Sequence, residues 1–173
     1  MNQRDYERKY LPEFVYGGID GAVTTFAVVS GVVGASLSPS IALILGFANL
    51  FGDGFSMAMS NYLSNISKEE LKKKQDHTAK KKALATFFSF IIIGFIPLLS
   101  FVLALITKSP FLVKNQFILS LSFTALAFIF VGWLKGDIVG KNKMKSAIET
   151  LLIGGIAAAV AYFTGYFINS LIR

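Results

Sequence analysis

Residues 40–64, SIALILGFANLFGDGFSMAMSNYLS, form a long apolar stretch that also contains one acid, two amides and two methionines. A stretch of this length is enough for a helix to cross the hydrocarbon core of a bilayer, which takes about 20 residues. Four similar stretches lie near residues 14–37, 83–107, 115–134 and 148–172. The sequence therefore predicts an all-α, polytopic membrane protein with five transmembrane helices, folded as a single domain over residues 1–173.

The composition supports the membrane class. Of the 173 residues, 54% are hydrophobic and only 16% are charged, and the mean hydropathy is +0.60. These values are too apolar for an ordinary soluble domain. The segment before residue 14 mixes acids and bases and shows no small-residue cleavage site after a short apolar core. We therefore expect it to be retained as an amphipathic segment and not removed as a signal peptide.

The basic residues are distributed unevenly along the chain, whose net charge is +7. Of the 17 Lys and Arg residues, 14 lie before the first span, in the loop 65–82 or between the last two spans. The other three are Lys108, Lys114 and Arg173. The positive-inside rule then predicts a cytoplasmic N-terminus, a cytoplasmic basic loop over residues 65–82 and a C-terminus outside. We expect the loop lysines to face solvent and anionic membrane lipid, and we expect no nucleic-acid partner.

The chain lacks the residues of most catalytic centres. It has no cysteine and a single histidine, His77, which we expect to be exposed. Disulfides, thiolate metal sites and histidine-based metal cages are thereby excluded. No glycine-rich phosphate loop is present either, so the sequence argues against an enzyme.

Small residues and prolines predict how the spans pack. In the first span Gly17 and Gly21 are four residues apart, as are Gly31 and Ala35, and the last span is also rich in Gly and Ala. Such pairs let helix backbones approach closely in lipid. Pro39 is expected to open the second helix after a tight turn, and the proline at position 97 is expected to kink the third.

Three acids fall within the predicted spans: Asp20, Asp53 and Glu149. An ionised side chain at the centre of a membrane helix costs about 2.5–3.5 kcal/mol on insertion scales, so it normally faces a partner, water or a substrate path. No Lys or Arg lies deep in a predicted span, which favours a site for protons or cations over a structural salt bridge. Each of two acids has an alternative role: Asp53 as an acid that hydrogen-bonds between helices, and Glu149 as a partner of the dipole at a helix N-terminus.

The spacing of the polar residues groups them. Asn49, Asp53 and Met57 follow one another at intervals of four, which places them along one side of a helix. Asp20 and Thr24 form a similar pair in the first span. If the first two spans pack together, carboxylate, amide and thioether groups converge there. Oxygen ligands suit divalent ions and a thioether shifts the preference toward transition metals, although methionine in an apolar core is more often a packing residue.

Two stretches resemble the vacuolar iron transporter family: GGIDGAVTTFAVVSGVVGAS at residues 17–36 and GFANLFGDGFSMAMSNYLS at residues 46–64. The resemblance implies a homodimer of five-helix protomers that exports Fe²⁺ or a related ion such as Mn²⁺ in exchange for protons, with no permanently bound cofactor. It places Asp20 on the family's transport aspartate and Met57 on its metal-path methionine. Asn49 falls where plant-type members carry a glutamate, and Asp53, one turn away, is expected to replace that acid.

The loop 65–82 departs from the plant-type pattern. Those members carry a glutamate-rich cytoplasmic metal-binding domain, whereas this segment has only Glu69, Glu70 and Asp76 against seven lysines. The sequence thus predicts a short family member without the ion-collecting domain, and we expect a prokaryotic cell membrane as its location. The leading hypothesis is a proton-coupled exporter of divalent transition metals. The alternative is a membrane protein of the same fold that transports nothing and acts as a scaffold or binds a partner.

Overall fold

The computed structural model describes residues 3–73 and 78–172, with side chains in the first helix described from Lys9 onward. His77 lies outside the described residues. The described chain is helical throughout and contains no strand. Its six helices are α1 (Gln3–Gly34), α2 (Pro39–Lys72), α3 (Ala79–Gly94), α4 (Ile96–Thr107), α5 (Pro110–Val139) and α6 (Lys143–Ile172).

Four of these helices, α1, α2, α5 and α6, are long and apolar enough to cross a membrane, and the bent pair α3 and α4 together would make a fifth span. The protein is therefore a polytopic membrane protein, as predicted. The span predicted over residues 83–107 consists of two helices, α3 and α4, that meet at an angle of 49°. The predicted kink is present: Pro97 lies in the first turn of α4 and has no N–H to continue the hydrogen bonds of α3.

Two hydroxyl groups, one from α4 and one from α5, join these helices beside the bend. The Ser120 hydroxyl donates a hydrogen bond of 2.6 Å to the carbonyl of Pro97. One turn further, the Ser100 hydroxyl of α4 donates a bond of 2.7 Å to the carbonyl of Gln116. Polar groups at membrane depth require such partners, since no water is there to replace them. Both bonds lie on the α4 side of the break, so they tie α4 to α5 directly after the bend.

The basic segment is more helical than expected. The loop predicted over residues 65–82 is helical through Lys72 at one end and from Ala79 at the other. The C-cap residue Lys73 adopts a left-handed conformation with φ of 49°. Helices α1, α5 and α6 likewise begin before the apolar stretches that predicted them, because helices continue into polar segments outside the membrane, whereas α1 ends at Gly34, short of the predicted residue 37.

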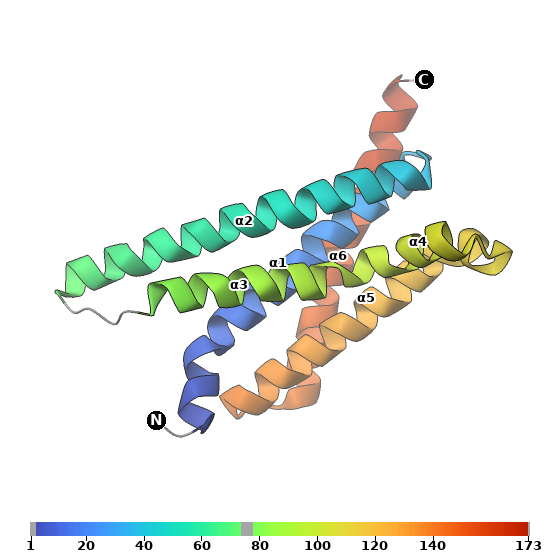
Figure 1. The fold of residues 1–173 in the computed structure, drawn as a ribbon. Coiled ribbons are helices and arrows are strands. Elements are labelled where there is room, and N and C mark those ends of the chain that lie inside the picture. The colour runs from blue at the N-terminus through green and yellow to red at the C-terminus, as the bar shows by residue number, and fades with distance from the viewer. Residues whose placement is uncertain (1–2, 74–77, 173) are drawn as a thin grey trace.

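Helix α1 lies at the centre of the bundle and contacts every other helix. Figure 1 shows the N-terminus and the α2–α3 and α5–α6 connections on one side of the molecule, with the C-terminus and the α1–α2 and α4–α5 connections on the opposite side. We call the first side the N-terminal end of the bundle. The segments rich in lysine thus share one end, as the charge distribution predicted.

Glycines form the tightest seams of α1. A Cβ atom at Gly21 would lie 2.5 Å from the carbonyl oxygen of Phe90 in α3, and one at Gly34 would collide with the backbone of Tyr162 in α6. Gly165 of α6 abuts the backbone of Gly31 in the same way. These contacts bring helix backbones together directly, which is how small residues stabilise helix packing in lipid.

Candidate functional site

The candidate site is a polar cluster between the middle of α1 and the middle of α2, formed by Asp20, Thr24, Asn49 and Asp53. The Thr24 hydroxyl donates a hydrogen bond of 2.8 Å to the backbone carbonyl of Asp20. This i to i−4 bond leaves the hydroxyl oxygen facing α2. The Thr24 hydroxyl is therefore fixed on the face of α1, one turn beyond Asp20.

Asn49 joins α2 to this face. Its side-chain NH₂ group donates to the hydroxyl oxygen of Thr24 at 3.3 Å and approaches that of Thr25 at 3.5 Å. The amide oxygen of Asn49 accepts no hydrogen bond from the described residues. Because the NH₂ group is used by the threonines, this oxygen is left for a ligand or for water.

The two carboxylates of the cluster lie on the same seam between the helices, each one turn from the Asn49–Thr24 hydrogen bond. Both Asp20 and Asp53 are half-buried, and neither forms an ion pair with a described residue. Two neighbouring negative charges in a membrane are costly unless a cation or a proton is present. The cluster therefore has the charge and the oxygen atoms to hold a divalent cation.

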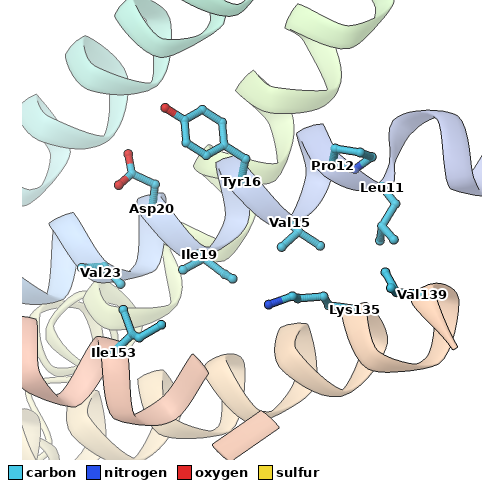
Figure 2. A pocket seen from close by; sticks show the side chains of 10 residues that line it. All are labelled: Leu11, Pro12, Val15, Tyr16, Ile19, Asp20, Val23, Lys135, Val139 and Ile153. Carbon is cyan, nitrogen blue, oxygen red and sulfur yellow. The ribbon is translucent and has the colours of Figure 1, made fainter. Parts of the chain in front are cut away.

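A basic residue lies closer to this region than the sequence indicated. Lys135 of α5 and Asp20 line the same cavity of 490 Å³, whose other walls are mostly apolar side chains. Figure 2 shows the Asp20 carboxylate directed to the same side of α1 as Tyr16, while Lys135 approaches from the side of Ile19. The two charged groups form no ion pair in the described structure, so the acid is not neutralised by this lysine.

Met57 occupies a different environment from its predicted neighbours. Its side chain is buried in an apolar cluster with Leu50 of α2 and Phe90 of α3. Four residues rotate an α-helix by about 400°, which is about 40° more than a full turn. Two such steps therefore place Met57 about 80° around the helix axis from Asn49. The stripe predicted from sequence consequently rotates from α1 toward α3, and Met57 faces α3.

Glu149 lies apart from the polar cluster. Its side chain is exposed near the start of α6 and lines a cavity of 340 Å³ together with Lys135, Lys141 and Lys145. Three lysines at one cavity repel metal ions. The structure thus brings Asp20, Asn49 and Asp53 together and leaves Met57 and Glu149 elsewhere.

Sequence reasoning missed one buried acid. Glu13 of α1 is 7% exposed, and one of its carboxylate oxygens lies 3.5 Å from the ammonium of Lys82 in α3. The signal was its position, two helical turns before Asp20 on the same face of α1. It was overlooked because it borders the charged N-terminal segment, outside the apolar stretch.

Among the described residues, no three His, Cys, Asp or Glu side chains gather as they would in a resident metal centre. Any cation at the polar cluster would therefore be held by two carboxylates together with amide or hydroxyl oxygens and water. Such partial, oxygen-rich coordination is better suited to an ion in passage than to one held permanently. The fold and this cluster define a membrane protein with paired carboxylates between two spans.

Comparison with known proteins identifies the family. The VIT family profile matches residues 11–81 and 66–166. The chain is similar to the vacuolar iron transporter of Toxoplasma gondii, with 25% identity covering 95% of this chain and 76% of that protein. It is also similar to vacuolar iron transporter homolog 4 of Arabidopsis thaliana, with 27% identity covering 91% of this chain and 84% of the relative. This chain belongs to the VIT family.

The two alignments differ in length. The alignment with the Toxoplasma protein extends over 229 positions, more than the 173 residues of this chain, so that relative contains inserted residues. The alignment with the Arabidopsis homolog extends over 174 positions. The length of this chain therefore matches the Arabidopsis homolog better than the Toxoplasma protein over the aligned region.

Proposed function

We propose that this protein is a proton-coupled transporter that moves divalent transition-metal ions, Fe²⁺ or Mn²⁺, out of the cytosol. One observation carries the proposal: Asp20 and Asp53 lie one helical turn from Thr24 and Asn49, which are hydrogen-bonded across two membrane spans, and neither acid has an ion-pair partner among the described residues. Relatives in the VIT family that are named vacuolar iron transporters support the same substrate class. The chain is proposed as a transporter and not as an enzyme.

The ligand atoms favour a divalent ion. The cluster offers two carboxylates, the free amide oxygen of Asn49 and the hydroxyl of Thr24. Oxygen ligands suit Mn²⁺ and Fe²⁺. The thioether of Met57 would add a soft ligand only if its side chain left the apolar cluster with Leu50 and turned toward Asp53, which lies one turn away.

Proton coupling follows from competition for the same oxygens. A carboxylate must be deprotonated to bind a metal ion, so metal release and proton uptake are linked. When the metal leaves, the two acids of the cluster are left in a medium that disfavours a pair of bare charges. A proton gradient would then drive the ion in the opposite direction.

Orientation and assembly complete the proposal. The lysine-rich N-terminal end of the bundle would face the cytoplasm under the positive-inside rule, and the metal would leave toward the side of the C-terminus. A homodimer in a prokaryotic cell membrane, surrounded by lipid, is proposed from the family resemblance. The inserted residues of the longer relatives have no counterpart here, so we propose that the ion binds directly at the membrane cluster.

The proposal is tested by Mn²⁺ and Fe²⁺ uptake into proteoliposomes under an imposed pH gradient. Asp20→Asn and Asp53→Asn should each slow uptake at least about tenfold, since losing about 1.4 kcal/mol of binding costs that factor. The exposed residue Asp137 is the matched control, because its acid pairs with Lys143 far from the cluster. Uptake by Asp20→Asn at the rate of the unmodified protein would exclude the assigned path.

A further inference from the structure

Glu13 is a buried acid that is not part of the polar cluster. Its side chain lies between α1 and α3, with one oxygen 3.5 Å from the ammonium of Lys82. The other oxygen, Oε2, is fully buried and has no hydrogen-bond partner among the described residues. Such an unsatisfied carboxylate oxygen is rare, because burial without a partner is unfavourable.

The ammonium of Lys82 marks a position where a cation is bound by oxygens of two helices. Besides Glu13 of α1, it contacts the side-chain oxygen of Asn65 in α2 at 3.3 Å. The NH₂ group of Asn65 is held by the backbone and side-chain oxygens of Asn61 at 2.8 and 2.9 Å. Asn61 thereby fixes the Asn65 amide so that its oxygen points at the positive charge.

The same oxygens form a partial ligand set for a metal ion. A carboxylate with a free second oxygen and an oriented amide oxygen are both groups that divalent cations accept. Glu13 also lies two turns, about 10.5 Å along the helix, from Asp20, on the face that carries the polar cluster. It precedes Asp20 in α1, toward the start of that helix.

We propose that Glu13 and Asn65 form a second divalent-cation site in which the ammonium of Lys82 is a tethered occupant. A metal ion binds there only when Lys82 withdraws, so the lysine controls occupancy of the site between the N-terminal end and the polar cluster. Lys82 also explains how the acid stays buried while no metal is bound, since removal of one member of a buried pair leaves an uncompensated charge. The identity of the cation rests on the proposed function, whereas the site itself does not.

The test counts Mn²⁺ bound to the purified full chain, using the electron paramagnetic resonance signal of the unbound ion at neutral pH. Lys82→Met should bind one more Mn²⁺ per protomer than the unmodified protein. The double variant Glu13→Gln/Lys82→Met should return to the original number. Lys81→Met is the matched control, because Lys81 is exposed on the same helix and should leave the number unchanged.

Two further variants keep the outcome interpretable. Lys82→Gln retains a polar side chain and is measured beside Lys82→Met, with the thermal unfolding of both followed as Mn²⁺ is added, since a ligand of the folded state raises its stability. In the background Asp20→Asn/Asp53→Asn, the extra ion of Lys82→Met should remain. The result then separates this site from the polar cluster, whose failure to bind metal would count against the proposed function alone.

The inference is overturned if folded Lys82→Met and Lys82→Gln both bind the same number of ions as the unmodified protein. It is also overturned if the extra ion survives the removal of the Glu13 carboxylate. Loss of the extra ion in the Asp20→Asn/Asp53→Asn background would show that Lys82 acts on the polar cluster and not on a separate site, and would overturn it as well.

Discussion

The two seams that α1 makes with its neighbours α3 and α2 are built in opposite ways. Toward α3, Gly17 and Gly21 bring the backbones into direct contact, with no room for even a methyl group. Toward α2, the contact near the middle of the helices consists of a long hydrogen bond from Asn49 and two half-buried acids. At the glycines the α1–α3 seam leaves no space between the backbones, whereas the middle of the α1–α2 seam keeps oxygen atoms available; the Glu13–Lys82 pair lies nearer the start of α1.

The difference between the seams distinguishes contacts that stabilise the fold from contacts that can bind an ion. A glycine seam stabilises the bundle without polar groups, through close packing. The α1–α2 seam leaves two acids without an ion-pair partner among the described residues, which a structure selected only for stability would avoid. The predictions below treat the first seam as structural and the second as the place where ions bind.

The largest effect is expected from Gly21→Ala. The added Cβ would meet backbone atoms of Phe90 at 2.5 and 3.0 Å, and backbone cannot move aside as a flexible side chain can. Overpacking of this kind costs about 1–3 kcal/mol, which should appear as a lower thermal unfolding temperature in detergent. Gly52→Ala is the matched control on α2, since nothing lies within 4 Å of that position. Equal unfolding temperatures for the two variants would show that the seam is not tight.

Asn49→Leu is expected to reduce Mn²⁺ uptake more than stability. Removal of the amide oxygen should slow Mn²⁺ uptake about tenfold, corresponding to about 1.4 kcal/mol of lost ion binding. Stability should change little, because hydrogen bonds between membrane helices contribute about 0.6 kcal/mol on average. Proteoliposome uptake and thermal unfolding are measured on the same preparation. Asn115→Leu, at an amide that only bonds its own helix, should affect neither; a loss of stability without a loss of uptake would make the α1–α2 seam structural.

The α4–α5 seam provides an intermediate case. Ser120→Ala removes the hydroxyl that bonds the Pro97 carbonyl at the bend, and should lower the free energy of unfolding by about 0.6 kcal/mol while uptake is retained. Ser122→Ala serves as the comparison, because that hydroxyl bonds within its own helix. A slower uptake in Ser120→Ala with unchanged stability would assign the bend a part in transport.

The smallest effect is expected from Glu149→Gln. This acid is exposed and surrounded by lysines, and exposed substitutions usually change free energies by less than about 0.5 kcal/mol, roughly a factor of two in rate. Uptake should stay within that factor. A tenfold loss would extend the ion path to the cavity between α5 and α6 and would contradict the confinement of the site to the α1–α2 seam.

Much of the fold follows from hydropathy, and the rest depends on what hydropathy does not measure. The apolar stretches located the spans, and the proline at position 97 located the bend. They did not locate the helix ends, because the segment through Lys72 is polar yet continues α2. Hydropathy marks where lipid lies, whereas helices end where their backbone hydrogen bonds find no further partner.

The candidate site was predictable only as far as single helices allow. Spacing placed Asn49 and Asp53 on one face of α2, and the structure brings that face to Thr24, one turn from Asp20. Spacing did not show that Met57 rotates toward Phe90, since that depends on which neighbour α2 meets. The pair of Glu13 and Lys82 joins residues far apart in the sequence, and no local pattern predicts which lysine of a basic segment reaches a buried acid.

The contact between α1 and α6 has a consequence for biosynthesis. Gly31 and Gly34 of the first helix pack on the backbone of Tyr162 and Gly165 in the last one. A nascent chain inserts its helices in order, so this seam stays open until translation is almost finished. Contacts between distant segments form late and slowly. The first helix, which carries Asp20, must therefore wait in the membrane with an unpaired glycine face until the final span is released from the ribosome.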